Sequence, residues 1–193
     1  MKNILLIGGS YGIGLAIAKE LQFENNVYIA SRSNENLSEV KATHISFDAT
    51  TDTIDTSQLP TVIDGLVYCP GSINLRPFKR LKPEAFETDL QINFISLVKV
   101  IQSVLPNLLA SEQASIVTFS SVAATMGMPF HTSVAASKGA IEGFAKALAA
   151  EYAPKIRVNV IAPSLTDTPL ADKFLHNETK QEKSAERHPL KRF

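Results

Sequence analysis

The chain has 193 residues, of which 45% are hydrophobic and 20% charged, a length and composition typical of one globular domain. Its 19 basic and 19 acidic residues balance, which argues against the clustered basic excess of a nucleic-acid-binding protein. With one cysteine no internal disulfide can form, and no apolar run reaches the roughly 18 residues of a membrane span. We therefore expect a cytoplasmic protein with no nucleic-acid or membrane partner. Its length predicts a single domain over residues 1–193.

Short apolar runs alternate with longer helical patterns along the chain. The predicted strands are Ile4–Ile7, Val27–Ala30, His44–Phe47, Gly65–Tyr68, Ile116–Phe119 and Val158–Ile161. The predicted helices are Gly12–Phe23, Glu84–Leu109 and Ser133–Tyr152. Several strands are nearly continuous in Ile, Val, Leu or Phe, as strands covered on both faces are. Because strands that alternate with helices indicate right-handed crossovers, the sequence predicts a doubly wound α/β domain built on a parallel sheet.

Three segments are less regular. The polar segment Asp48–Pro60 is predicted as a loop or a short helix. Pro83 suits the first turn of the second predicted helix, whereas Pro106 is expected to kink or end that helix. The charged tail from Lys173 to Arg192 has mixed signs, which is typical of a solvated helix or loop.

The first predicted strand runs directly into a glycine-rich turn that opens a helix. Gly8, Gly12 and Gly14 have the G-x-x-x-G-x-G spacing, which allows a tight turn and a close approach of the backbone to a pyrophosphate. The free N–H groups at the start of the helix attract the same anion. A turn that serves only packing is the alternative, but the strand-turn-helix context favours a dinucleotide site that also includes Ser10 and Ile13.

The end of the second predicted strand bears on which dinucleotide binds. An NAD site places a carboxylate there, where it binds the ribose 2′-hydroxyl. This chain has Arg32 and no acidic residue at that place. The planar guanidinium can bond a phosphate at two points. A solvated surface arginine is the alternative reading of Arg32. The sequence favours NADP(H) over NAD(H) as the cofactor, and we expect no metal site.

From the N-terminus to about Pro169 the chain resembles the classical short-chain dehydrogenases/reductases, a family with a Rossmann-like domain. The resemblance rests on the glycine turn, on Asn93 in Gln-Ile-Asn-Phe, on Ser121 at the end of the fifth strand and on Lys138 in Ala-Ser-Lys. It implies catalytic roles for Asn93, Ser121 and Lys138.

The resemblance also implies further contacts with the cofactor. The residues it assigns to them are Asp48, Gly71, Lys138, Pro163 and Thr168. In this family the aspartate contacts the adenine, and the Pro-to-Thr segment holds the nicotinamide carboxamide. The chain departs from the pattern where Cys69-Pro70 replaces Asn-Ala before the glycine, and where Ser164 replaces a glycine.

The decisive departure is at position 134. The family carries a tyrosine four residues before the lysine and thirteen after the serine, and both counts land on Val134. The resemblance implies that this tyrosine gives a proton to the forming alkoxide, while the adjacent lysine lowers the pKa of the phenol and the serine orients the substrate oxygen. Valine cannot donate or accept a proton.

Three hypotheses follow from this departure. The first is an NADPH-linked oxidoreductase that reduces a small carbonyl, or oxidises the alcohol, with activity impaired by Val134. The second is a non-catalytic NADP(H)-binding protein, and the third is a substitution at position 134 of an otherwise active enzyme. His131 is a candidate substitute acid. Tyr152 lies eighteen residues further along the predicted helix, roughly 27 Å away, which is too far.

The resemblance also implies features beyond the cofactor site. The residues expected near the substrate cleft are Met126, Met128, Phe130 and Leu165. A helix can begin within Leu170–His176, and the chain ends before the family's seventh strand, so we expect a sheet that lacks this strand. Members of the family pair through their two long helices, which implies a homodimer or a homotetramer.

Overall fold

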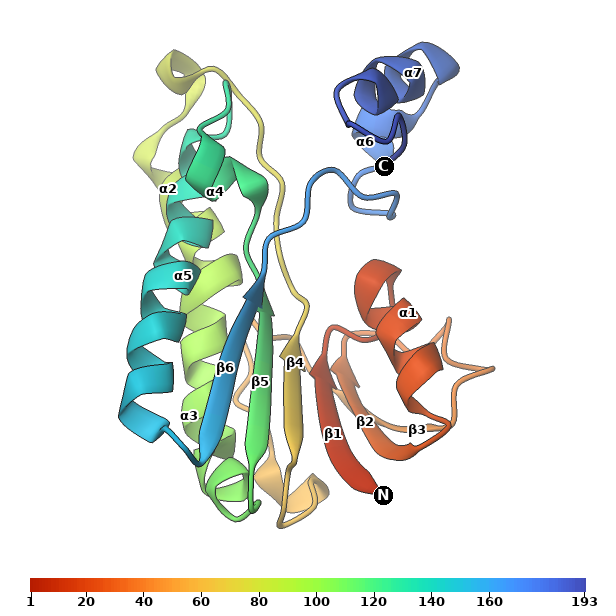
Figure 1. Cartoon of the computed structure of the whole chain (residues 1–193), viewed down its shortest axis with the longest axis vertical. Helices are drawn as coiled ribbons and strands as arrows, with labels where there is room; N and C mark the ends of the chain where they lie inside the picture. The colour runs from red at the N-terminus through yellow and green to blue at the C-terminus, as the bar shows by residue number, and fades with distance from the viewer.

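Six parallel strands form the central sheet, in the order β3-β2-β1-β4-β5-β6 (Figure 1). The computed structural model describes every residue from Met1 to Phe193. The strands are β1 (Lys2–Ile7), β2 (Asn25–Ser31), β3 (Ala42–Ser46), β4 (Gly65–Tyr68), β5 (Ala114–Phe119) and β6 (Ile156–Ile161). All neighbouring pairs are parallel, and the order is that of a Rossmann sheet. The predicted doubly wound α/β fold is therefore confirmed.

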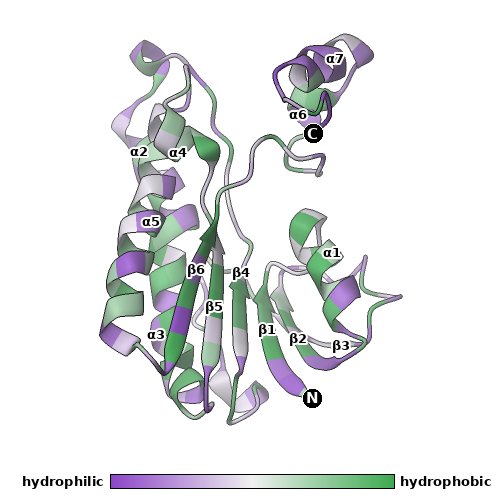
Figure 2. Cartoon of the chain, in the orientation of Figure 1, coloured by the Kyte–Doolittle hydropathy of each residue, from purple (hydrophilic) through white to green (hydrophobic).

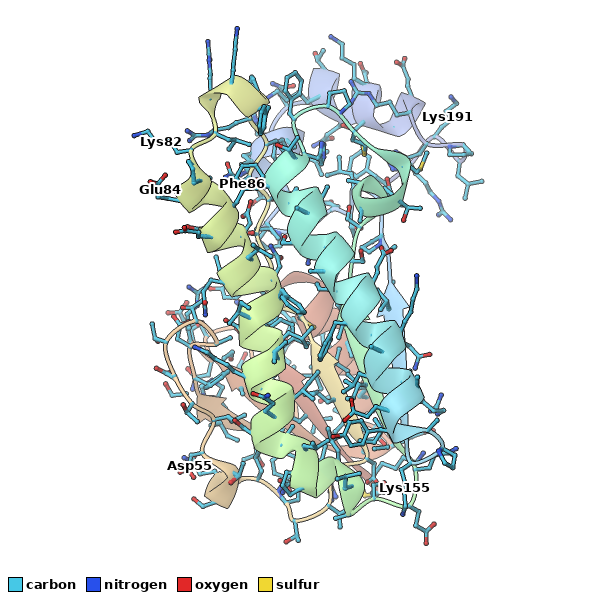
Figure 3. All side chains as sticks on the ribbon, turned by 90° about the vertical axis from the view of Figure 1, so that its left-hand side faces the viewer. Asp55, Lys82, Glu84, Phe86, Lys155 and Lys191 are labelled. Carbon is cyan, nitrogen blue, oxygen red and sulfur yellow. The ribbon has the colours of Figure 1, made fainter.

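Helices cover both faces of this sheet. The long ones are α1 (Gly12–Leu21), α2 (Pro83–Leu90), the π-helical turn η3 (Gln91–Ile95), α3 (Ser96–Leu109) and α5 (Thr132–Tyr152). α1 lies on one face (Figure 1). On the other face α2, η3 and α3 form one continuous helix beside α5, and Figure 3 shows this pair from outside, with Glu84 and Phe86 at the start of the first helix.

Each strand divides its side chains between the two helical layers. In β1, Leu5 and Ile7 belong to the core cluster that contains Leu97 of α3. Leu6, between them, belongs to a second cluster with Ala18 of α1. Both faces of the strand are therefore buried, which explains why its sequence is apolar throughout rather than alternating. Figure 2 shows the same pattern as hydrophobic colour along the inner strands.

The helix over residues 83–109 departs from the uniform pattern that the sequence predicts. At η3 the Ser96 N–H donates to the Gln91 carbonyl, and the Ser96 Oγ donates to the same oxygen at 2.8 Å. A π turn contains one residue more than an α turn. The extra residue rotates the side chains after η3 about the helix axis, relative to those before it, so residues that would share one face of a regular helix point in different directions.

Pro106 does not end this helix, so that part of the prediction was wrong. The Ala110 N–H donates to the Pro106 carbonyl at 3.1 Å, and α3 continues to Leu109. A proline removes only its own N–H donor and disturbs the preceding turn. Near the end of a helix this loss is small, because few later bonds depend on it.

The same helix corrects a second expectation. Residues 83–109 are long and apolar enough to cross a membrane by length and composition alone, whereas the sequence analysis found no stretch of that kind. Leu97, Val104 and Leu108 of this helix are completely buried against the sheet. A helix at the core of a globular domain has the same composition, and its packing identifies this one as a core helix.

Several short helices complete the chain. They are η1 (Thr56–Gln58), η2 (Phe78–Arg80), α4 (Val122–Met126), α6 (Asp172–Leu175) and α7 (Glu178–Glu186). The segment Asp48–Pro60 contains only η1, in agreement with the prediction. α4 was not predicted, and it begins at Ser121, whose Oγ accepts the Ala123 N–H at 3.2 Å. The tail forms α6 and the polar α7, which is largely hydrophilic in Figure 2.

Candidate functional site

The sequence candidates gather at one edge of the sheet. Parallel strands end at the same edge, and a loop follows each of them. The residues that follow strands β1 to β6 are, in order, Gly8, Arg32, Asp48, Gly71, Ser121 and Pro163. The order of the strands reverses between β1 and β4, and ligands of open α/β sheets bind at such a switch point. The fold therefore brings together residues that lie up to 155 positions apart in the sequence.

Three glycines of the turn between β1 and α1 occupy places that disfavour a side chain. Gly8 and Gly12 have φ values of 77° and 49°, a region that favours glycine. At Gly14 an added Cβ would collide with the carbonyl oxygen of Gly8 and would lie 3.1 Å from the Gly9 Cα. These contacts are with backbone, which cannot rotate away. Glycine at these places therefore keeps the turn closely packed against the start of the helix.

The start of α1 is open to an anion. Tyr11 occupies the N-cap position and its side chain makes no capping hydrogen bond, so the N–H groups of the first turn remain available. Ser10 is buried beside the turn and Ile13 is half-buried. The turn and the helix start together fit a pyrophosphate, because the backbone can approach closely and present several donors.

The segment after β6 lies across the ends of the strands. Pro163 is anchored to the start of α4, since its carbonyl accepts the Val122 N–H at 3.2 Å. Thr168 reaches the glycine turn, where its Cβ lies 3.4 Å from the position of a Cβ on Gly12. Lys173 then donates to the Ile73 carbonyl at 2.6 Å. The segment therefore passes over the switch point, as its path in Figure 1 also shows.

Arg32 and Asp48 lie on neighbouring strand ends. Arg32 is exposed and forms no hydrogen bond or ion pair, since the one salt bridge of the chain joins Lys19 to Glu39. The Oδ1 of Asp48 accepts the Thr50 hydroxyl at 2.6 Å and the Thr50 N–H at 2.9 Å. These bonds, with a smaller contribution from the charge of Arg32, lower the pKa of Asp48. The guanidinium is thus free to bind an anion.

Three catalytic positions of the resemblance lie after the end of β5 and in the first two turns of α5. Val134 and Lys138 lie one turn apart on α5, and both are buried. The Lys138 Nζ donates to the carbonyl of Phe119, the last residue of β5, at 2.9 Å. Ser121 lies two residues further on and is half-buried. The Lys138 amine is therefore bonded at the end of β5, two residues before Ser121, and an aliphatic side chain lies one turn earlier on α5, where the family has a phenol.

Burial lowers the pKa of Lys138 to about 8, although its interactions with Asp89 and, to a smaller extent, with Cys69 act in the opposite direction. In the other direction, burial raises the pKa of the Cys69 thiol to about 12. An added Cβ on Gly71 would lie 3.3 Å from the Lys138 Nζ. The loop after β4 therefore passes directly beside the ammonium group.

We expect the Lys138→Met variant to be more stable than the unmodified chain by roughly 2 kcal/mol near pH 7. The folded chain holds its proton on Lys138 less tightly than the unfolded chain does, with a pKa of about 8 instead of 10.5. Its free energy of unfolding therefore rises with pH between these values. The variant lacks this rise, and the loss of a donor for the Phe119 carbonyl reduces its advantage.

Denaturant unfolding from pH 7 to pH 10 measures the difference. Cys69 acts in the opposite direction above pH 9, but its contribution is common to both chains. Lys155→Met, at the exposed lysine beyond α5 labelled in Figure 3, is the matched control and should show no pH-dependent gain. A stability difference for Lys138→Met that is the same at every pH would show that burial does not perturb this amine.

Asn93 lies in a buried polar network. Its Nδ2 donates to the Ser137 Oγ at 3.0 Å, to the Ser72 Oγ at 2.9 Å and to the Asp89 carbonyl at 2.9 Å. Its Oδ1 accepts the Ser72 N–H at 3.2 Å. Asp89 and Ser72 were missed in the sequence analysis. Asp89 could have been found, because a carboxyl four residues before Asn93 lies on the same side of a helix.

The remaining candidates are less involved in the site. His131 is half-buried, and its Nδ1 is hydrogen-bonded to the Pro129 carbonyl at 2.7 Å. Met126 and Phe130 are 77% and 55% exposed. Leu165 is half-buried. The apolar residues expected near the substrate cleft are thus mostly exposed side chains, and they form no enclosed wall.

Comparisons with known proteins agree with this geometry. A sequence model of the short chain dehydrogenase family matches residues 2–179. The chain is 30% identical to the 3-oxoacyl-(acyl-carrier-protein) reductase FabG of Thermotoga maritima, covering all of this chain and 84% of the relative. It is 33% identical to a tropinone reductase homolog of Datura stramonium, covering 87% of this chain and 69% of the relative.

Among solved structures, the chain is similar to a short-chain dehydrogenase/reductase of Brucella melitensis described as a glucose/ribitol dehydrogenase. The TM-score is 0.88 at 27% identity, covering all of this chain and 83% of the other. A ligand-free aldohexose dehydrogenase of Thermoplasma acidophilum gives a TM-score of 0.85 at 25% identity, with 100% and 81% covered. On its sequence and on its fold, the chain belongs to the short-chain dehydrogenase family of oxidoreductases.

Proposed function

We propose that the chain is an NADPH-linked reductase of a small carbonyl compound, which also runs in reverse as an alcohol dehydrogenase, and that Val134 limits its turnover. The observation that carries this proposal is the convergence of the glycine turn and the buried Lys138 at the switch point of the sheet. We further propose that it acts in the cytoplasm as a homodimer or a homotetramer, paired through the long helices of Figure 3.

In this proposal the cofactor lies across the ends of the strands. The residues that hold it are Gly8, Ser10, Gly12, Ile13, Gly14, Arg32, Asp48, Gly71, Lys138, Pro163 and Thr168. The turn and α1 bind the pyrophosphate, Arg32 binds the 2′-phosphate, and Thr168 holds the carboxamide. The bound nicotinamide supplies or accepts a hydride.

The substrate binds between Ser121 and Lys138. The Ser121 hydroxyl holds the carbonyl oxygen in place, and the Lys138 ammonium stabilises negative charge that develops on it. Asn93 orients the polar network beside the lysine. These residues can still bind and orient the substrate. Val134 contributes no proton, so the site lacks the group that would transfer a proton to the substrate oxygen.

A second candidate function rests on Val134 itself. The side chain at this position is 6% exposed, so an apolar side chain is buried at the place of the phenol. A protein that binds NADP(H) without turnover, as a regulator or an inactive partner, would tolerate such a site. Titration with NADPH followed by a panel of ketones and aldehydes separates the two functions, because both require binding and only the first requires cofactor oxidation.

We expect NADPH to bind at least about tenfold more tightly than NADH, a difference of about 1.4 kcal/mol. Changing Arg32 to Ala should remove most of this preference, because the exposed guanidinium has no other partner. Fluorescence titration of the two reduced cofactors measures it. Arg157→Ala, at an exposed arginine within β6, is the matched control. Equal dissociation constants for the two cofactors in the unmodified chain would contradict the assignment of Arg32.

A further inference from the structure

The segment between β4 and α2 carries a cluster of positive charge that the function proposed above does not use. Arg76, Lys79, Arg80 and Lys82 lie within seven positions, with no acidic residue between them. All four side chains are exposed, and none of them takes part in the one salt bridge of the chain. Like charges held this close repel one another. The cluster therefore lowers the stability of the fold, and an anion bound among these cations would remove this cost.

Three of the four cations line one cavity. It has a volume of about 400 Å³, which is within the range of small-molecule sites. Arg76, Arg80 and Lys82 line it together with one carboxylate, that of Glu84, so three positive charges face one negative charge. Thr88 adds a hydroxyl donor. Figure 3 shows Lys82 and Glu84 at the start of α2. Since a guanidinium can bind a carboxylate or a phosphate at two points, this lining fits a small anion.

The backbone that carries Arg76 is held in place by other segments. Its N–H donates to the Phe130 carbonyl at 3.1 Å. Three residues earlier, the Ile73 carbonyl accepts the Lys173 Nζ at 2.6 Å. Phe130 itself has a φ of 70°, a region that a bulky residue seldom adopts and keeps only where its surroundings impose it. Arg76 is therefore presented by a preorganised loop, which lowers the cost of binding a ligand.

The cavity lies within reach of the candidate site. The loop passes the site at Gly71, where an added Cβ would lie 3.3 Å from the Lys138 Nζ. It reaches Arg76 five residues later, and five residues span at most about 18 Å. On the helix, Thr88 of the cavity lies five residues before Asn93, which is roughly 7.5 Å of helical rise. One molecule of moderate length can therefore extend from the site to the cavity.

We propose that this cavity binds the acidic group, a carboxylate or a phosphate, of the carbonyl compound that the chain reduces. The inference rests on the proposed reductase function and names its substrate class, carbonyl compounds whose acidic group is separated from the carbonyl by a chain of several atoms. Arg76 and Arg80 bind the anion, and Lys82 adds positive charge. These residues determine specificity and take no part in the transfer of the hydride or the proton.

Matched substrates measure the contribution of the acidic group. The panel contains keto acids with two to ten carbon atoms between the carbonyl and the carboxylate, their methyl esters, and keto phosphates of the same lengths. The ratio of kcat/KM for each acid to that for its ester should exceed about tenfold for the longer chains, a difference of more than about 1.4 kcal/mol. It should be near one for the shortest chain, which cannot span the distance. A preference confined to the keto phosphates would support a phosphate as the anion.

Arg76→Ala and Arg80→Ala should each lower this ratio about tenfold, the effect of losing a hydrogen bond to a charged group. The change should appear in KM, because the anion is bound equally before and during the reaction. Arg157→Ala, at an exposed arginine within β6, is the matched control. The rates are measured in the unmodified chain and in the faster Val134→Tyr chain. A ratio near one at every length for both anions, or one that is equally high at every length, would overturn the proposal, since the second result indicates attraction by charge without a site.

Nitrogen NMR of the arginine side chains in the cofactor-free chain tests the cavity without turnover. Inorganic phosphate, titrated at constant ionic strength, should move the Nε signals of Arg76 and Arg80 with one common dissociation constant and leave that of Arg157 in place. The alanine variants identify the signals. Movement of Arg76 and Arg80 no larger than that of Arg157 would overturn the anion site, whatever the turnover. Movement of both signals in a chain that reduces no carbonyl compound would support the anion site and overturn the reductase function alone.

Discussion

We expect the Val134→Tyr variant to reduce carbonyl substrates about 10²-fold faster than the unmodified chain, or more. Val134 lies one turn before Lys138 on α5, so a phenol at this place has the lysine beside it. The nearby ammonium lowers the pKa of a phenol and suits it to exchange protons near neutral pH. Ser121 and Lys138 are already in place, and the substitution adds the one missing group.

Steady-state oxidation of NADPH over a panel of ketones and aldehydes measures this gain. Val134 is buried, so the larger side chain has to displace its neighbours, at a cost of about 1–3 kcal/mol in stability. Thermal unfolding of both chains therefore accompanies the assay, and the Kd for NADPH should change little. If the tyrosine variant folds, binds NADPH and turns over nothing, the non-catalytic function is favoured. Equal rates in the two chains would show that the phenol is not the missing donor.

We expect Gly14→Ala to weaken NADPH binding by about 10²-fold or more, about 2.7 kcal/mol. The added Cβ collides with the Gly8 carbonyl oxygen. The turn has to open, which moves the first N–H groups of α1 away from the pyrophosphate. Gly12→Ala is the milder companion, because its Cβ has ordinary contacts with Thr168 and the strain comes from the positive φ alone.

Gly143→Ala is the matched control for this substitution. No heavy atom lies within 4 Å of the added Cβ at this position of α5. Alanine is favoured over glycine inside a helix by about 1 kcal/mol, so this variant should gain stability and bind NADPH as the unmodified chain does. Fluorescence titration and denaturant unfolding separate binding from folding. A folded Gly14→Ala chain with unchanged affinity would show that the cofactor does not lie on this turn.

The strands and the positions of the site candidates follow from local features of the sequence. Runs such as Leu5-Leu6-Ile7 are apolar throughout because both faces of the sheet are covered, and this property is visible without the fold. The parallel direction of the strands then predicts that the residues after each of them meet at one edge. For this reason Gly8, Arg32 and Ser121 could be placed together from the sequence.

The details that sequence reasoning missed depend on contacts between distant segments. The 2.6 Å bond between Ser72 and Asp89 joins a loop to a helix, and neither residue has a pattern that identifies the other. α4 begins because the Ser121 Oγ caps it, and this hydroxyl was considered only for its chemistry. The turn η3 has no special composition, since Gln, Ile, Asn and Phe all occur in ordinary helices.

The π turn lets one helix meet two incompatible demands. In a helix of constant pitch, Asn93 would share a row with Leu97 and Val100, because residues four and seven positions on lie on the same side. The side chains of Leu97 and Val100 are in the apolar core. The extra residue in η3 rotates the rows by about 100° relative to each other. The amide therefore reaches Ser137 and Ser72, while the leucine reaches the sheet. Substitutions on the α2 side of η3 can therefore alter this polar network while leaving the packing of α3 on the sheet intact.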